Sequence, residues 1–297
     1  MKRQNHGEKQ RGPYFEGWYL KCQTKAGEAL ALIPALHIDA ASRRSASLQV
    51  VTGCRAWQVD FPCEAFDASR EAFSVRLGES VFSSEGMVLD VDAPGLVLRG
   101  RLDFGPLTPL ASDIMGPFRL FARMECAHGV VSMAHPLSGQ VMLNGELLDF
   151  DDGMGYIETD RGRSFPSAYL WTQCLWAQPQ PVSLMCAVAA IPLPVGRFNG
   201  CICAICSGGR EVRLATYRGA RAERWSEDGA VIRQGKYRLE IDVLSAQGLP
   251  LRAPVQGEMT RTIRESLCAK VRYRFYIQNR LFFDHTDERA SFEFSRS

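Results

Sequence analysis

The stretch Met87-Val88-Leu89-Asp90-Val91-Asp92-Ala93-Pro94-Gly95-Leu96-Val97-Leu98 decides the fold class, because apolar and polar residues largely alternate along it. A period of two is typical of a β-strand with one buried and one solvated face. Asp92-Ala93-Pro94-Gly95 has the composition of a turn, and the alternation resumes after it as far as Phe104. Residues 87–104 are therefore predicted to form a β-hairpin.

The same period recurs further along the chain. Residues 141–148 carry Asn144-Gly145 between two apolar runs, which is a strong signal for a two-residue hairpin turn of type I′. Residues 237–243 and 271–277 alternate in the same way, and Arg261–Ala269 is the one candidate helix. Short strands separated by turns favour antiparallel sandwiches or barrels over a parallel sheet with crossover helices. We therefore expect an all-β protein.

The length of the chain predicts two domains. Its 297 residues correspond to about two units of roughly 150 residues each. The turn within Asp149–Gly155 follows a hairpin that closes an antiparallel set of strands. We place the boundary there, which gives domains of residues 1–152 and 153–297.

The charge balance excludes two classes of partner. Lysine plus arginine total 35 and aspartate plus glutamate total 33, a net charge of +2 that gives no bulk attraction to nucleic acid or to an anionic membrane. The basic and aromatic residues of 272–282 are accordingly interpreted as an amphipathic strand.

The basic N-terminus lacks a following apolar segment, and the longest apolar run, Cys186–Val195, is interrupted by prolines and too short to cross a bilayer. We expect a cytoplasmic protein with no nucleic-acid partner and no transmembrane segment.

The ten cysteines are expected to be reduced, as in other chains of this length without an export signal. Cys201-x-Cys203-x-x-Cys206 looks like a metal-binding run, but its first two thiols share one face of an apolar strand and a second ligand cluster is missing. His128 and His135 also lack a third ligand at a recognisable offset. We interpret the cysteines as buried strand residues and predict no metal site.

Three stretches combine titratable and aromatic residues in a way that composition does not explain. In the first, Pro13–Lys21, Glu16 and Trp18 share one face of a strand while Phe15 and Tyr19 share the other. Glu16 is either a functional carboxylate or a glutamate at the rim of a first strand.

The second stretch is Met124–His135, where Glu125 and His128 stand among small and apolar neighbours. They are either a hydrogen-bonded pair that fixes a loop or a pair that takes part in chemistry. Downstream, Trp171 and Gln173 share one face of a predicted strand and would line a pocket with one aromatic wall and one amide.

The third stretch is Gly155–Pro166, in which Glu158 and Asp160 point to the same face of a predicted strand. Like charges on one face raise the pKa of at least one carboxyl, which keeps a carboxylic acid protonated near neutral pH. The alternative is a structural network in which Arg161 and Arg163 pair with these carboxylates.

Taken together, these stretches resemble the tocopherol cyclase family, and in particular its bacterial branch. The motifs that carry the resemblance keep their order along the chain and are Phe15–Tyr19, Ile114–Phe118, Met124–His135, Gly155–Pro166, Ala215–Tyr217 and Leu251–Met259. The resemblance implies two lipocalin-like (calycin) antiparallel β-barrel or sandwich domains with few short helices, similar to hydroxyneurosporene synthase and the lipocalin-like Diels–Alderases.

The resemblance also implies an activity. Plant and cyanobacterial members of the family cyclise a prenylated hydroquinone to a chromanol without a cofactor, which requires a proton donor in a dry apolar site and aromatic faces that stabilise a cation. The implied catalytic acids are Glu16, Glu125 and Asp160. The implied ligand-binding residues are Trp18, Tyr19, His128, Glu158, Trp171, Gln173 and Trp176.

One departure from the family affects the choice of acid. The family usually has tryptophan after the position of Asp160, and this chain has Arg161. An arginine paired with Asp160 would lower the pKa of that carboxyl, so we expect Glu16 or Glu125 to donate the proton. The sequence thus predicts a cofactor-independent, cyclase-like isomerase that acts on a prenylated or polyene molecule. The alternative is a non-catalytic carrier or sensor of a hydrophobic ligand, which needs no buried acid.

Overall fold

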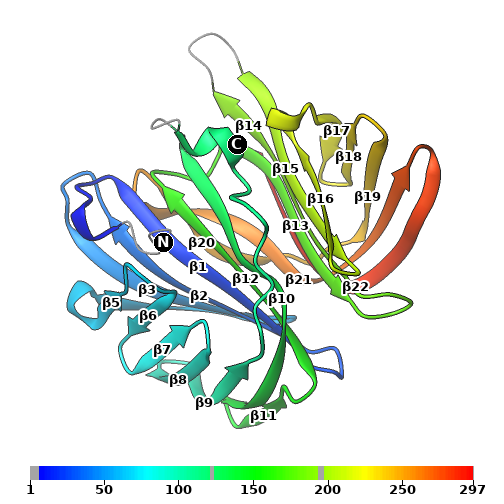
Figure 1. Cartoon of the computed structure of the whole chain (residues 1–297). Coiled ribbons are helices and arrows are strands. Elements are labelled where there is room, and N and C mark those ends of the chain that lie inside the picture. Colours follow the sequence, from blue (N-terminus) through cyan, green and yellow to red (C-terminus); the bar gives the residue numbers. More distant parts are fainter. Residues whose placement is uncertain (1–6, 121–123, 193–196, 297) are drawn as a thin grey trace. The chain divides into compact units, whose positions relative to one another are not determined.

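The computed structural model describes residues 7–120, 124–192 and 197–296, and it is built almost wholly from antiparallel strands (Figure 1). Within those ranges the helical segments are single short 3-10 turns. They are η1 (Gly7–Lys9), η2 (Cys63–Ala65), η3 (Gly116–Leu120) and η4 (Thr216–Arg218). The all-β fold class with few short helices is therefore confirmed. None of the helices in the described part of the chain is long and apolar enough to cross a lipid bilayer.

The chain divides into two compact units, each assembled from three stretches of sequence. Unit 1 contains residues 1–109, 125–165 and 252–261, and unit 2 contains residues 110–124, 166–251 and 262–297. The domain boundary expected between residues 152 and 153 stays a prediction.

The first sheet has twelve strands and holds most of unit 1. The strands are β1 (Tyr14–Gln23), β2 (Ala29–Ile38), β3 (Arg44–Thr52), β4 (Ala56–Pro62), β5 (Phe66–Ala68), β6 (Ser74–Leu77), β7 (Ser80–Ser83), β8 (Gly86–Ala93), β9 (Leu96–Phe104), β10 (Cys126–Leu143), β11 (Glu146–Asp149) and β12 (Gly153–Gly162). Their order is β4-β3-β2-β1-β12-β10-β9-β8-β7-β6-β5, and β11 pairs with β10 outside this path.

The second sheet has ten strands and holds most of unit 2. The strands are β13 (Ala168–Trp176), β14 (Val182–Pro192), β15 (Arg197–Ser207), β16 (Arg210–Ala215), β17 (Arg221–Ser226), β18 (Gly229–Gln234), β19 (Tyr237–Ser245), β20 (Leu249–Val255), β21 (Glu258–Ile277) and β22 (Arg280–Arg296). Their order is β16-β15-β14-β13-β22-β21-β19-β18-β17, and β20 pairs with β21.

Both sheets follow one topological rule. In each, neighbouring strands are mostly neighbours in sequence, and the last strand pairs with the first, β12 with β1 and β22 with β13. An antiparallel meander whose two ends meet in this way has the lipocalin-like arrangement that the sequence predicts. The fold is thus repeated in the two units without a short-period repeat in the sequence.

Each unit has its own hydrophobic core on one face of its sheet. Trp18, Leu20 and Cys22 of β1 point into the core of unit 1. The residues between them point to the opposite face, yet Tyr19 and Lys21 are also buried. A strand that is buried on both faces has one face for the core and a second face on which buried polar groups need partners.

The predicted hairpins are confirmed, and the predicted helix is wrong. β8 and β9 meet at Pro94-Gly95, and Asn144 and Gly145 both have the positive φ angles that a type I′ turn requires. Arg261–Ala269 lies instead within strand β21. Ile263 and Leu267 are four residues apart, a spacing that fits a helix and a strand equally well, and pairing of β21 with β22 decides between them.

Two of the sequence motifs pack against each other in unit 2. The Tyr217 hydroxyl donates to the Ile114 carbonyl over 2.9 Å, and the Tyr217 ring meets the Phe118 ring edge-on. Gly116 between them has φ of 52°, and a Cβ atom there would lie 2.6 Å from the Tyr217 ring. Glycine is therefore required both for the backbone and for the space.

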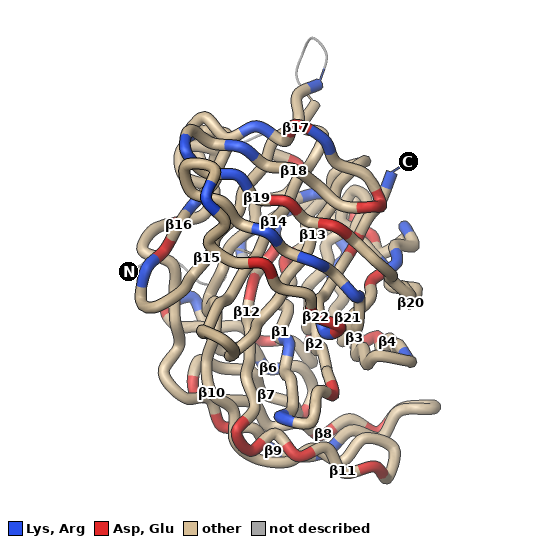
Figure 2. The backbone as a smooth tube through the Cα atoms, turned by 90° about the vertical axis from the view of Figure 1, so that its right-hand side faces the viewer, with Lys and Arg blue, Asp and Glu red and all other residues tan. Residues whose placement is uncertain are grey.

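Several surface charges of unit 2 form ion pairs within or between strands, and acidic and basic positions are interleaved over β17, β18 and β19 (Figure 2). Arg272 is 2.6 Å from Asp284, and Arg274 is 2.6 Å from Asp242. Arg272 and Arg274 are thus paired with neighbouring carboxylates, as expected for the basic face of an amphipathic strand.

Two buried histidines make the stability of unit 1 depend on pH. Burial lowers the pKa of His37 to about 4 and the pKa of His135 to about 4, against about 6.5 in an unfolded chain. The unfolded state therefore binds protons first as the pH falls, and stability is lost between pH 6.5 and pH 4. We expect up to about 3 kcal/mol of loss from each histidine over this range.

Denaturant unfolding at several pH values measures this loss. In His37→Gln the free energy of unfolding should fall less steeply between pH 6.5 and pH 4 than in the parent protein, whatever its value at pH 7. An unchanged slope would show that His37 is protonated in the folded state.

Candidate functional site

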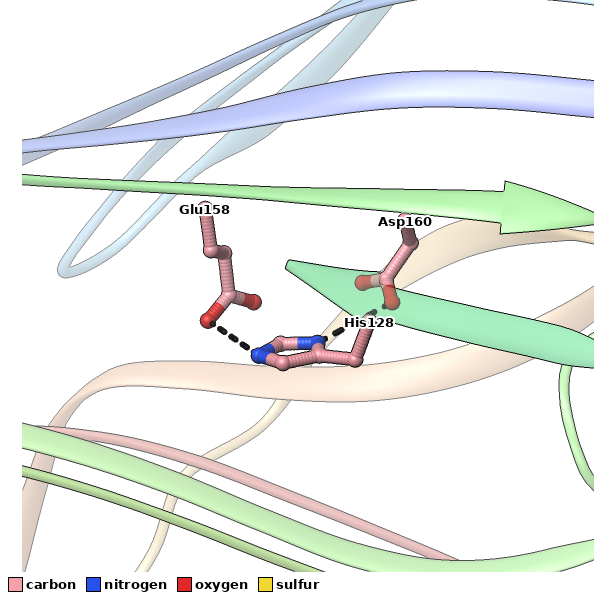
Figure 3. Close-up of side chains that lie close together, drawn as sticks. All are labelled: His128, Glu158 and Asp160. Carbon is pink, nitrogen blue, oxygen red and sulfur yellow. Dashed lines mark hydrogen bonds and ion pairs between the residues drawn. The ribbon is translucent and has the colours of Figure 1, made fainter. Parts of the chain in front are cut away.

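A histidine held between two carboxyl groups forms the most distinctive polar cluster in unit 1 (Figure 3). Nδ1 of His128 on β10 lies 3.0 Å from Oδ1 of Asp160, and its Nε2 lies 3.4 Å from Oε2 of Glu158. Both acids stand on β12, two residues apart. The register pairs His128 with Asp160, which places all three side chains on the sheet face opposite the core.

Two more side chains extend the cluster at its ends. The Tyr156 hydroxyl donates to Oε2 of Glu158 over 2.5 Å, and the Cys126 thiol donates to Oδ1 of Asp160 over 3.4 Å. Burial raises the pKa of the Cys126 thiol well above its usual range, and the Asp160 charge raises it further. The result is a continuous series of polar groups from Tyr156 through Glu158, His128 and Asp160 to Cys126.

The two nitrogens of the His128 ring differ in how they meet the acids. Nδ1 is within hydrogen-bond distance of Oδ1 of Asp160, and Nε2 lies within ion-pair distance of Oε2 of Glu158. A neutral imidazole donates at one ring nitrogen and accepts at the other, and a protonated imidazole donates at both. The arrangement therefore places a group that can bind or release a proton between two carboxyl groups.

The same three residues could also serve as metal ligands. Ligand atoms of His128, Glu158 and Asp160 lie within 4.8 Å of one another. A histidine ligates a metal through one nitrogen only, so the carboxylate at the other nitrogen would orient the ring from outside the coordination sphere. Each ring nitrogen here already faces a carboxyl oxygen, which fits a proton-transfer cluster better than a metal centre.

The strand β1 adds two buried residues to this face. Tyr19 is directly opposite Glu158, and Lys21 is directly opposite Tyr156. Both are buried, Lys21 completely. The sequence analysis proposed Tyr19 but missed Lys21, Tyr156 and Cys126. These residues alternate with apolar core positions along their strands, which was the available signal. The signal is weak, because polar residues that alternate in this way usually indicate a solvated face.

Glu16 and Trp18 lie on the other face of the first sheet, together as predicted. Glu16 is buried and accepts hydrogen bonds from the Gly7 backbone N–H at 2.9 Å and from the Tyr14 hydroxyl at 3.2 Å. Trp18 is a core residue that stacks on Phe66. Glu16 is therefore not part of the histidine cluster.

Arg161 belongs to the Glu16 side of the sheet. The register places it opposite Glu16 on β1, one residue out of phase with Asp160. The hydrogen bonds of Asp160 to described residues go to His128 and Cys126. The expected pairing of Arg161 with Asp160 is therefore not seen, because alternation along β12 sends the two side chains to opposite faces.

Glu125 contributes through its backbone. It immediately precedes β10, and its carbonyl accepts hydrogen bonds from the N–H groups of Arg163 at 2.8 Å and Ser164 at 3.2 Å. This contact joins the beginning of β10 to the end of β12, and so it supports the two strands that carry the cluster.

The remaining predicted residues lie on β13 in unit 2. Trp171 and Gln173 share the face opposite the core, as predicted, and both are buried. Trp176 points into the core, where its ring stacks on His285 at 4.2 Å and on Tyr273 at 6.1 Å.

Unit 2 also contains a carboxyl pair that the sequence analysis missed. Glu265 on β21 stands opposite Glu293 on β22, which is itself paired with Trp171. The Tyr169 hydroxyl donates to Glu293 over 2.7 Å. Assigning residues 261–269 to a helix concealed this pair, because only a strand brings Glu265 into register with Glu293.

Comparison with known proteins places these features in a family. The model of the tocopherol cyclase-like family matches residues 123–294, more than half of the chain and the part that holds β10, β12 and β13. The chain belongs to this family. The resemblance seen in the sequence motifs is thereby confirmed. No curated protein matches the sequence.

Solved structures share the fold of the chain. Kievitone hydratase from Nectria haematococca aligns over 96% of this chain and 90% of its own, with 10% identity and a TM-score of 0.56. CghA with Sch210972 aligns over 96% of this chain and 89% of its own, with 13% identity and a TM-score of 0.57. At these identities the comparison establishes the lipocalin-like fold alone.

Cys126 provides a chemical probe of the cluster. Because burial and the Asp160 charge raise the pKa of its thiol, we expect Cys126 to react with iodoacetamide at pH 8 far more slowly than the exposed Cys54 and Cys268. Asp160→Asn removes the charge but not the burial, so it should increase the rate at Cys126 and leave the two exposed thiols unchanged. Peptide mass spectrometry measures all three rates in one sample, and an unchanged Cys126 rate would contradict the contact.

Proposed function

We propose that this protein binds a hydrophobic, alkene-bearing small molecule and catalyses its cyclisation by proton transfer, with the Glu158–His128–Asp160 cluster as proton donor and acceptor. The observation that carries the proposal is the imidazole held between two carboxyl groups on a buried strand face. Tocopherol cyclase-like family membership supports the class of reaction.

The proposed reaction needs one proton and returns one. A proton adds to one carbon of a trisubstituted alkene and leaves a tertiary cation on the other. A hydroxyl oxygen of the same molecule then bonds to the cation and releases its own proton. Substrate and product are isomers, so a cluster that contains both a protonated and an unprotonated group completes the cycle without a cofactor.

The exposed fractions of the three side chains support a division of roles within the cluster. The side chain of Asp160 is 23% exposed, against 10% for His128 and 5% for Glu158. Asp160 is therefore the member that a ligand can reach, and we assign it the proton donor. Glu158, fixed by the Tyr156 hydroxyl, holds the far nitrogen of His128 and keeps the ring in place. Tyr19, on the same face, offers an aromatic ring to the cation.

Glu16 and Glu125 stay predicted acids, and we rank them below Asp160 as proton donors. Glu16 lies on the core side of the sheet, and the hydrogen bonds described for Glu125 are made by its backbone carbonyl. The name of kievitone hydratase indicates addition of water to its substrate. Protonation of a double bond is also the first step of hydration, so water in place of the internal hydroxyl would give a hydration by the same cluster.

Asp160→Asn should reduce turnover by about 10²-fold or more, since an amide cannot donate the proton. The assay uses a 2-prenylated hydroquinone in D₂O, in which each turnover places one deuterium on carbon, and mass spectrometry counts the label. Asp90→Asn, which changes an exposed aspartate of the same unit, is the matched control and should keep full activity.

Glu16→Gln and Glu125→Gln separate the candidate acids. Both variants should retain turnover if Asp160 is the proton donor. Loss of turnover in one of them, together with an active Asp160→Asn variant, would instead identify that glutamate as the donor. Binding of the prenylated hydroquinone without any deuterium incorporation in the parent protein would favour the carrier function over the enzyme.

A further inference from the structure

Gln173 is a completely buried amide with unsatisfied hydrogen-bonding groups. It lies in the middle of β13, and neither its Oε1 nor its Nε2 has a hydrogen-bond partner among the described residues. A primary amide offers two donors and an acceptor, and burying them unpaired is costly. Such a group in a folded protein requires a specific explanation.

The strands beside β13 do not satisfy the amide. Met185 on β14 and Ser291 on β22 are directly opposite Gln173. Met185 is buried and offers no strong hydrogen-bonding group, and the backbone carbonyl of Ser291 accepts a hydrogen bond from the Thr172 hydroxyl. On its own strand, Gln173 shares its face with Trp171, while the neighbours Thr172 and Cys174 point to the core side. The amide thus lies beside a large aromatic ring on the face that the core does not use.

A second buried glutamine in this protein does use both its nitrogen and its oxygen in hydrogen bonds. Gln49 on β3 donates from Nε2 to the Arg252 carbonyl over 3.0 Å and accepts at Oε1 from the Arg252 N–H over 2.8 Å. One peptide segment therefore supplies a donor and an acceptor to one side-chain amide. Gln173 has the same two groups, equally buried, and neither is used by the described chain.

We propose that Gln173 is the group of unit 2 that recognises the polar end of a hydrophobic ligand, and that this end carries a hydrogen-bond donor and an acceptor side by side, as an amide or lactam does. Such a group reproduces at Gln173 the contacts that Arg252 makes with Gln49. Trp171 then covers the adjoining apolar part of the molecule. The inference rests on the proposed function only for the hydrophobic character of the ligand, and it does not depend on the proton chemistry of Asp160.

The proposal has a consequence for the protein without ligand. Replacing a satisfied buried amide by leucine leaves its partners unpaired and destabilises the fold, whereas replacing an unsatisfied one removes a cost. Gln173→Leu should therefore keep or raise the melting temperature of the ligand-free protein. Gln49→Leu, the matched control, should lower the melting temperature, because it leaves the backbone N–H and the carbonyl of Arg252 without their side-chain partners.

The binding test compares oleamide, whose primary amide has both a donor and an acceptor, with methyl oleate, which has an acceptor only. Quenching of tryptophan fluorescence gives both dissociation constants. The parent protein should bind oleamide about tenfold more tightly than methyl oleate, and Gln173→Leu should abolish this preference while it retains methyl oleate binding. Gln49→Leu and Asp160→Asn should keep the preference, so that loss of turnover in Asp160→Asn alone tests the proposed function separately.

Two results would overturn the inference. A fall in melting temperature for Gln173→Leu as large as that for Gln49→Leu would show that the amide is satisfied without ligand, by an internal water molecule. Equal binding of the two probes by the parent protein, or an unchanged preference in Gln173→Leu, would show that Gln173 does not hydrogen-bond to the polar end of the ligand.

Discussion

Successive side chains of a β-strand point to opposite faces of its sheet, and the position of every candidate residue in this protein depends on that constraint. Along β12 it separates Asp160 from Arg161, and along β1 it separates Tyr19 from Trp18. One face of each sheet is occupied by a hydrophobic core. The histidine cluster of unit 1 lies on the other face, where the side chains of Tyr19, Lys21 and Glu158 are also buried.

The pairing of β10 with β12 fixes the geometry on which the proposed proton transfer depends. His128, Glu158 and Asp160 stand on paired strands whose backbone hydrogen bonds fix the spacing of the three side chains. Sites built on strands hold their geometry more closely than sites built on loops. The carbonyl of Glu125 adds a backbone link between the beginning of β10 and the end of β12.

The sequence predicted the fold class well because period-two alternation and turn chemistry are local signals. Asn144-Gly145 has one low-cost conformation, and the chain adopts it. It also predicted that Glu158 and Asp160 share a face. The sequence could not predict that His128 lies between them, because the pairing of β10 with β12 is a long-range contact. Nor could it separate helix from strand for residues 261–269, where the decisive partner is β22.

The position of β12 has a consequence for how the protein is made. Strands β1 to β4 pair with their neighbours in sequence, and so do most of the strands from β5 to β10. β12 alone joins these two groups, and it is synthesised last of all the strands in the first sheet. Until it leaves the ribosome, β1 and β10 each present an open edge, and His128 has neither of its acids. Folding of this sheet therefore depends on a contact between distant parts of the chain, and the histidine cluster assembles in the same event that joins the two groups of strands.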